Sequence, residues 1–258
     1  MKVRKLYELL EEKIPRSLSC EWDNDGLMCC PCGDNEVGKV LVALDVTGEV
    51  VEYAMQNGYD VILSHHPLIY KGLKSFDDNG YVSAKLISLA KSDISVMSFH
   101  TRLDAVMGGV NDKFAALLNL SDIEPLYCEG ISLGRVGNTS SVMSAEAFAK
   151  KVKEILGAPF VLLSDAGVNV SRVAVVGGNG EDLIAEAKRM GADTFVSGRL
   201  DYHLMTDAPD QKIQKMNFIE AGHFFTENPV CEVLRGFVLD IDSKIECDIY
   251  CSNIIKAI

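Results

Sequence analysis

Two segments of the chain share one pattern of apolar and polar positions. Residues 39–64 and 172–197 each begin with a short β-branched run, continue with an amphipathic stretch of helical period and end in a second apolar run. They align without a gap at an offset of 133, the separation of Gly58 and Gly191, which are predicted to end the two helices. Each segment therefore predicts a β–α–β unit with parallel strands and a right-handed crossover. The identical pairs are Val40/Val173, Val42/Val175, Ala54/Ala187, Gly58/Gly191, Asp60/Asp193 and Ser64/Ser197.

Shorter patterns on either side of this repeat complete the predicted architecture. The first 15 residues form an amphipathic helical pattern, and Ser144 is a plausible N-cap for a helix over residues 145–156. Further helices are expected near residues 84–90, 110–118 and 228–235, with strands near 94–98 and 244–250. We predict an α/β protein of two related halves with mixed, largely parallel sheets. The halves are residues 1–124 and 125–258, and the last strand could belong to either.

Composition narrows the protein class. The chain has 258 residues, of which 48% are hydrophobic and 24% charged, as is usual for a globular protein. It contains no apolar run of about 18 residues, so no membrane span is expected. The N-terminal segment lacks the apolar core of a signal peptide, and we expect a cytoplasmic protein. A net charge of −12 argues against general nucleic-acid binding, which needs Lys and Arg along the phosphates.

Eight cysteines raise the question of a thiolate metal site. Only Cys29, Cys30 and Cys32 are clustered, and they lack a second pair at zinc-finger spacing. Free thiols in a loop or at a strand end are the favoured interpretation of this cluster.

Histidines and a carboxylate follow two of the predicted strands. His65 and His66 come directly after the strand at residues 61–63, and His100 and Asp104 follow the strand at residues 94–99. The carboxyl ends of parallel strands share one edge of a sheet, so these side chains are expected to lie close together. Simpler roles stay open: a capping pair for His65 and His66, a core histidine for His100, and an N-cap or turn for Asp104.

A second donor pair lies near the C-terminus. His223 and Glu227 are four residues apart and share one face of a helical turn, although ordinary surface pairs have the same spacing. Three imidazoles and two carboxylates exceed the four ligands of a closed structural zinc site and suit two bridged metals. Nitrogen and oxygen donors without thiolate fit Zn, Fe, Mn, Co or Ni. The candidate ligands are His65, His66, Asp104, His223 and Glu227.

Six motifs spread along the chain resemble one known family. With them, the sequence resembles the type 2 GTP cyclohydrolase I family, also called the Nif-three-like dinuclear metal-centre proteins, in a short form without the inserted middle domain. The motifs are EWDNDGL at Glu21–Leu27, SHHPLIY at Ser64–Tyr70, HTRLDAVMGGVND at His100–Asp112, GRVG at Gly134–Gly137, SGRLDYH at Ser197–His203 and AGHFFTENPV at Ala221–Val230.

The resemblance implies a function and an assembly. It implies two divalent metal ions held by the five candidate ligands in a site between the halves, with Glu227 as the bridge. It also implies a toroidal homohexamer and conversion of GTP to dihydroneopterin triphosphate and formate. Two departures affect the surroundings of the site: Asp201 stands where the family usually has Lys, and Glu220-Ala221 replaces the usual Asp before Gly-His.

The remaining candidates concern proton transfer and phosphate. His100 and His203 are the candidates for proton transfer, because imidazole titrates near working pH, and a structural role is the alternative for each. Gly177–Gly180 could cradle phosphate, although a tight turn is the simpler interpretation. Two other functions stay open: a dinuclear metallohydrolase acting on another nucleotide or small molecule, and a non-catalytic hexameric scaffold that handles metal or regulates a partner.

Overall fold

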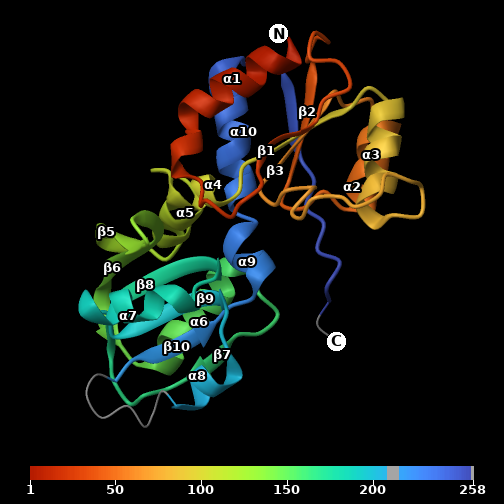
Figure 1. Cartoon of the computed structure of the whole chain (residues 1–258). Coiled ribbons are helices and arrows are strands. Elements are labelled where there is room, and N and C mark those ends of the chain that lie inside the picture. Colours follow the sequence, from red (N-terminus) through yellow and green to blue (C-terminus); the bar gives the residue numbers. More distant parts are fainter. Residues whose placement is uncertain (208–214, 257–258) are drawn as a thin grey trace. The chain divides into compact units, whose positions relative to one another are not determined.

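The computed structural model describes residues 1–207 and 215–256 (Figure 1). The chain forms two compact units, one of residues 1–106 with 230–255 and the other of residues 107–229 with Lys256. The predicted boundary at residue 124 is therefore displaced. Helix α5 (Val110–Leu117) and strand β5 (Ser121–Cys128) belong to the second unit because they pack on its sheet, and the last strand belongs to the first unit.

The first unit is built around a five-stranded sheet of order β1-β4-β3-β2-β11. Its strands are β1 (Gly26–Cys29), β2 (Lys39–Ala43), β3 (Val61–Ser64), β4 (Ser95–Ser98) and β11 (Glu246–Ile249). The β1–β4 pair is antiparallel and the other pairs are parallel. Because β2 and β3 are buried on both faces, their sequences are nearly continuous apolar runs. Strand β4 is equally buried but has a serine at each end.

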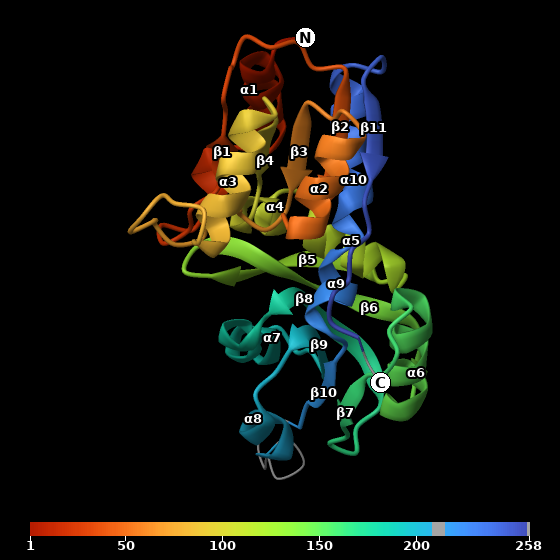
Figure 2. The ribbon, with the colours of Figure 1, turned by 90° about the vertical axis from the view of Figure 1, so that its right-hand side faces the viewer.

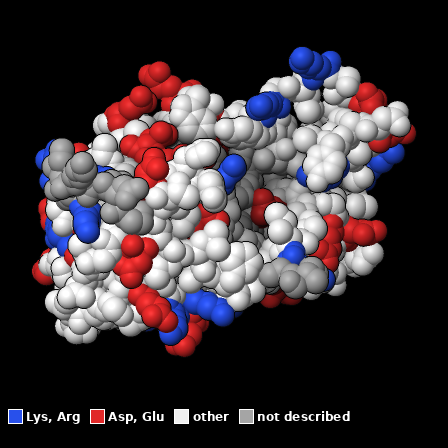
Figure 3. All heavy atoms as spheres, turned by 90° about the horizontal axis from the view of Figure 1, so that it is seen from below, with Lys and Arg blue, Asp and Glu red and all other residues white. Residues whose placement is uncertain are grey.

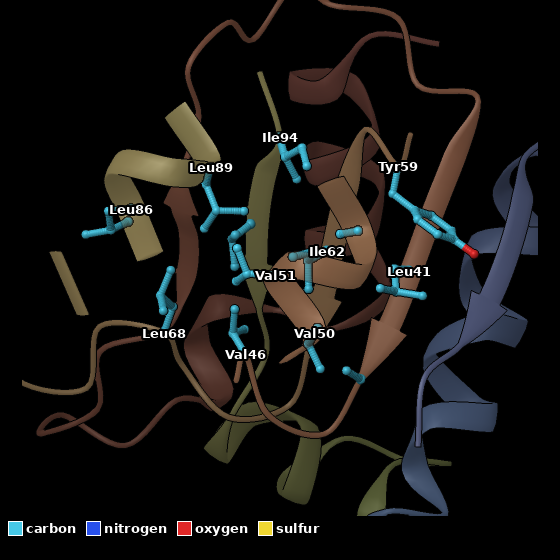
Figure 4. Close-up of a cluster of buried hydrophobic side chains, with 13 residues drawn as sticks. Leu41, Val46, Val50, Val51, Tyr59, Ile62, Leu68, Leu86, Leu89 and Ile94 are labelled. Carbon is cyan, nitrogen blue, oxygen red and sulfur yellow. The ribbon is translucent and has the colours of Figure 1, made fainter. Parts of the chain in front are cut away.

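Helices cover both faces of this first sheet (Figure 1). Helices α2 (Gly48–Gln56) and α3 (Tyr81–Lys91) pack on one face, where Val50, Leu89 and Ile62 join one buried cluster (Figure 4). On the other side, α10 (Val230–Ile241) contacts β2 and β11, and α1 (Val3–Lys13) packs against α10. The sheet is thus the middle layer of three.

The second unit contains a six-stranded sheet of order β5-β6-β8-β9-β10-β7. The β8–β9 and β9–β10 pairs are parallel and the others antiparallel. Helices α5 and α6 (Ala145–Leu156) cover one face and α7 (Ile184–Arg189) covers the other (Figure 2). The remaining strands are β6 (Ile131–Met143), β7 (Leu162–Ser164), β8 (Val170–Asn179), β9 (Thr194–Arg199) and β10 (Asn217–Glu220).

The structure explains the identities in the internal repeat. Val40 pairs with Val61 in one unit and Val173 with Thr194 in the other, both in parallel register. The Asp60 carboxylate accepts hydrogen bonds from two successive backbone N–H groups at the start of β2, and Asp193 does the same in β8. The prediction of an α/β fold with two mixed, largely parallel sheets is confirmed.

Other features agree with the pattern analysis. Gly58 and Gly191 follow α2 and α7 with φ of 65° and 80°, the left-handed conformation of a C-cap. Ser144 accepts a hydrogen bond from the Ala147 N–H and caps α6. Within the described ranges, no helix has the length and apolarity needed to cross a bilayer. On the face shown in Figure 3, acidic and basic side chains are interspersed.

Candidate metal centre

In the first unit, three histidines lie at the carboxyl ends of neighbouring parallel strands. His65 and His66 follow β3, and His100 follows β4. The chain leaves the β3 strand here: the His66 N–H donates to Leu44 O at 2.9 Å, and the Ser64 hydroxyl donates to His66 O at 2.8 Å. The two adjacent imidazoles can therefore lie with ring centroids 4.9 Å apart, instead of on opposite faces of a strand.

Each of these imidazoles is held through Nδ1 by an oxygen. Carbonyl and ionised carboxylate oxygens only accept hydrogen bonds, so each Nδ1 carries a proton and Nε2 is the ring nitrogen that can act as a metal ligand. One nitrogen from each ring lies within 4.8 Å of the others, a spacing that could hold a metal ion. The hydrogen bonds run from His65 to Phe99 O at 3.0 Å, from His66 to Asp45 Oδ1 at 2.7 Å and from His100 to Asp23 Oδ1 at 2.8 Å.

Asp104 adds a carboxylate to this group. It lies on the short helix α4 (Thr101–Ala105), and its Oδ1 is 3.9 Å from His65 Nε2. Two atoms that each lie about 2.0–2.2 Å from one ion are separated by up to about 4.4 Å, so this distance fits two ligands of one metal. The His65 ring is fully buried, so its orientation is fixed by packing as well as by Phe99 O.

A buried ionic cluster holds α4. Arg102 is fully buried and donates to Asp25 Oδ2 at 2.9 Å, to Glu11 Oε1 at 2.9 Å and to Ile14 O at 3.1 Å. Asp25 also accepts from the His100 N–H at 3.1 Å. This cluster therefore anchors the turn that carries His100 at one end and Asp104 near the other.

Asp23 is the main partner of His100. Its carboxylate also accepts from the Thr101 N–H at 3.0 Å and from the Thr101 hydroxyl at 2.6 Å. Burial alone would raise the pKa of Asp23, but the hydrogen bonds from His100 and Thr101 outweigh burial and lower the pKa to about 2. Asp23 is thus ionised at neutral pH and accepts the Nδ1 proton of His100.

In the second unit, helix α9 (His223–Glu227) presents the other donor pair. His223 Nε2 lies 2.9 Å from Glu227 Oε2, as the i,i+4 spacing predicts. Glu227 is buried, while the His223 side chain is about half exposed. A buried carboxylate beside an imidazole is a donor pair well suited to binding a divalent cation.

Glycines make room for α9. A Cβ atom on Gly178 would lie 2.3 Å from Glu227 Oε1, and one on Gly198 would lie 2.6 Å from Thr226 Oγ1 and 2.8 Å from His223 Cα. Gly178, with φ of 62°, lies in β8, which extends to Asn179. In this structure, the glycines of the Gly177–Gly180 stretch allow α9 to lie close to the sheet.

His203 does not join the donor groups that the structure shows. It lies on α8 (Tyr202–Asp207), is exposed, and belongs to none of the metal-capable groups found in residues 1–207 and 215–256. Asp201, which stands where the family usually has Lys, accepts a hydrogen bond from the His203 N–H at 2.8 Å and so caps α8. Glu220, which is part of the other departure from the family pattern, accepts a hydrogen bond from the Leu200 N–H at 2.8 Å and anchors the segment before α8.

The cysteine cluster lies at the end of β1. Cys29 is the last residue of that strand, and Cys30 and Cys32 follow it. Burial, followed by the neighbouring Cys30, raises the pKa of the Cys29 thiol. None of the three belongs to a metal-capable group in the part of the chain that the structure describes.

Sequence reasoning did not assign Asp23 or Asp45 to the site. Asp23 lies in the EWDNDGL motif, which supported the family resemblance but contains none of the proposed metal ligands. Asp45 follows β2, so the rule that functional loops follow the carboxyl ends of parallel strands could have found it. The signal for Asp23 was weaker, because β1 is antiparallel to its neighbour.

Comparison with known proteins decides the family. A family model described as Duf34/NIF3 (NGG1p interacting factor 3) matches residues 1–257. The chain belongs to this family. The resemblance drawn from the motifs is thereby confirmed.

Relatives of this Duf34/NIF3 chain carry a common name. A protein of Clostridium perfringens is 33% identical over 95% of each chain, and one of Methanocaldococcus jannaschii is 33% identical over 88% of this chain and 90% of its own. Each is named a GTP cyclohydrolase 1 type 2 homolog. These names support a function at the level of the family.

Solved structures agree with the family fold. A hypothetical protein of Staphylococcus aureus has a TM-score of 0.88 and 30% identity, covering 100% of this chain and 99% of its own. Reduced HcgD from Methanocaldococcus jannaschii has a TM-score of 0.82 and 30% identity, covering 96% and 97%. The Duf34/NIF3 fold therefore extends over both units of the chain.

Proposed function

We propose that this chain is a dinuclear metal-dependent enzyme of the hydrolase type. The proposed ligands are His65, His66, Asp104, His223 and Glu227, with Glu227 as the bridge and two divalent ions per chain. The observation that carries the proposal is the group formed by His65, His66 and His100, in which each Nδ1 is hydrogen-bonded to an oxygen. This arrangement directs Nε2 of His65 and His66 to metal ligation and Nε2 of His100 to proton transfer. The i,i+4 donor pair on α9 and the family membership support it.

In this proposal His100 moves protons. When bound, the two ions supply Lewis-acid activation of water and of the substrate. His100 keeps its Nδ1 proton on Asp23, so Nε2 is the atom that accepts a proton from the reacting group and later returns it. The ionised Asp23 stabilises the imidazolium that forms in between. His203 is a second candidate for proton transfer.

The proposed reaction is that of a GTP cyclohydrolase, which converts GTP to dihydroneopterin triphosphate and formate. The names of the relatives support this choice of substrate. The test measures metal content per chain on protein purified without chelator, followed by formate release from GTP on the same sample. About two metals per chain with formate release is the expected result.

Other outcomes separate the alternative functions. Two metals without formate release would contradict the cyclohydrolase assignment and favour another nucleotide or small molecule as the substrate. Metal that exchanges readily, without turnover of any nucleotide tested, would favour a metal-handling scaffold. Absence of metal in a folded chain that also fails to bind added Zn²⁺ or Mn²⁺ would contradict the site itself.

The ligand assignment has its own test. His223→Ala and Glu227→Ala should each lose most of the bound metal while circular dichroism shows a folded chain, because each removes a proposed ligand. Glu232→Ala, which removes an exposed carboxylate of α10, is the control and should keep its metal. Full metal retention in both ligand variants would overturn the assignment.

We further propose a cytoplasmic homohexamer, as the family resemblance implies. Light scattering coupled to size exclusion should then give six times the chain mass of 28.2 kDa. A monomer at micromolar concentration would contradict the hexamer without bearing on the metal ligands.

A further inference from the structure

Two large aromatic side chains stand exposed beside the histidine group of the first unit. Trp22 is 61% exposed and Tyr70 is 51% exposed. Aromatic side chains of this size bury about 150–250 Å² when they pack, so leaving two together in water forgoes substantial hydrophobic stabilisation. Trp22 is also the single tryptophan of the chain. Two neighbouring exposed rings of this kind indicate a binding site, because they add little to the stability of the fold itself.

Trp22, Tyr70 and His100 form an aromatic corner. The ring centroids are 6.4 Å apart for Trp22 and Tyr70, 6.3 Å for Trp22 and His100, and 6.2 Å for Tyr70 and His100. The interplanar angles are 74°, 76° and 88°, so the three ring planes are nearly perpendicular to one another. A flat ring that stacks on one member of such a corner meets the other members edge-on.

The corner is held in place although two of its rings are exposed. Asn24 donates from Nδ2 to Ile69 O, which ties the Trp22 loop to the Tyr70 loop. Asp23, the neighbour of Trp22, is fixed by its hydrogen bonds with His100 and Thr101. Rings positioned before binding lose less conformational entropy when a ligand arrives.

We propose that the aromatic corner binds a planar heteroaromatic ring, such as a nucleobase, and presents it to His100. The indole N–H, the phenol hydroxyl and the imidazole Nε2 are polar groups that heteroatoms of such a ring can satisfy, whereas a purely apolar partner would leave them without hydrogen bonds. The corner includes the ring of His100, so its ligand lies within the reach of that imidazole. This inference rests on the proposed function for the reaction that follows binding, but the binding itself does not.

The test uses the fluorescence of Trp22 in the full metal-loaded chain. Guanosine 5′-monophosphate should quench the emission saturably, while ribose 5-phosphate, which lacks the base, should not. Tyr70→Ala should weaken the affinity by about 5- to 150-fold, the range expected for loss of one stacking partner. Tyr70→Phe keeps the ring and loses only the hydroxyl, so it should weaken the affinity much less than Tyr70→Ala does. Phe76→Ala, which removes another exposed ring six residues further along, is the matched control and should leave the affinity unchanged.

Three results of the binding experiment would overturn the inference, and a fourth comes from the protein alone. They are no saturable quenching by the guanine nucleotide, equal quenching by ribose 5-phosphate, and an affinity unchanged by Tyr70→Ala. A Trp22 emission maximum that shifts with protein concentration in the absence of ligand would show a second copy covering the corner and would also overturn it. Because binding is read without turnover, a chain that binds guanine nucleotide but releases no formate would keep this inference while the cyclohydrolase proposal fails.

Discussion

Asp23 connects the chemistry of the site to the stability of the first unit. Its carboxylate is buried and accepts hydrogen bonds from the His100 ring, the Thr101 hydroxyl and two backbone N–H groups. These bonds lower its pKa from 3.8 to about 2 despite burial. The ionised form therefore stabilises the folded state at every pH above the unfolded-state value.

That stabilisation gives a pH-dependent prediction. The contribution of Asp23 is fully present above pH 3.8 and is lost as the pH falls through about 2. At neutral pH it is on the order of 2 kcal/mol. Urea unfolding of wild type and Asp23→Asn should show this difference at pH 6, and the difference should shrink toward pH 2. A difference that stays constant over this range would contradict the assigned pKa.

Arg102 gives a second prediction at the residue scale. Its guanidinium is fully buried with the Asp25 carboxylate, which also pairs with the half-exposed Arg16. Arg102→Met should therefore leave the buried carboxylate without its buried partner and cost about 3 kcal/mol of unfolding free energy. Lys2→Met removes the partner of Asp34 in an exposed pair and serves as the control, with an expected cost below about 1 kcal/mol. Equal effects of the two substitutions in urea unfolding would refute the argument.

At the scale of elements, the position of α9 depends on glycines in two neighbouring strands. Gly178 lies in β8 and Gly198 in β9, and both leave space that α9 occupies. The motif SGRLDYH therefore contributes a packing position as well as the segment that leads to α8. The register of β8 and β9 is fixed by their apolar pattern, so α9 must adapt if the space is filled.

Gly198→Ala tests this packing. Its Cβ would lie 2.7 Å from Gly178 O and 2.8 Å from His223 Cα, so backbone must shift and α9 should be displaced. Metal affinity, measured by competition with a chromophoric chelator, should fall about 10- to 100-fold, as for loss of a group that orients a ligand. Gly236→Ala in α10 is the control, because its Cβ meets nothing within 4 Å, and it should bind metal normally. An unchanged metal affinity in Gly198→Ala would contradict this role of the glycine.

At the scale of the whole molecule, the proposed metal ligands are spread along the sequence. Three lie between residues 65 and 104, and two lie at residues 223 and 227. A ligand that binds only the folded chain stabilises it by mass action. Metal bound by the proposed ligands would therefore stabilise the folded chain.

Metal removal tests this stabilisation. At a free metal concentration about 100 times Kd, binding contributes about 2.7 kcal/mol, so treatment with EDTA should lower the Tm by several degrees and added Mn²⁺ or Zn²⁺ should restore it. His223→Ala should respond much less to either treatment. A Tm that is the same with and without EDTA, in protein shown to contain metal, would contradict the prediction.

Features that depend on neighbours along the chain could be predicted from the amino-acid sequence. The two β–α–β units, the glycine C-caps at Gly58 and Gly191 and the Ser144 N-cap follow from local periodicity and local hydrogen bonds. The His65–His66 pair was identified because a residue that follows a parallel strand has a known place at the sheet edge. The fold class and the candidate donor residues could therefore be predicted from the sequence.

Features that depend on residues far apart in the chain became visible only in the folded structure. The pairing of Asp23 with His100 spans 77 residues and that of Asp45 with His66 spans 21, and no periodicity encodes either one. Strand β5 was not predicted because it is largely exposed and lacks an apolar run, and the unit boundary at 106 follows from where it pairs. The physical reason is that hydrogen bonding and burial between distant segments are set by packing, whereas local propensity reports only on the nearest neighbours.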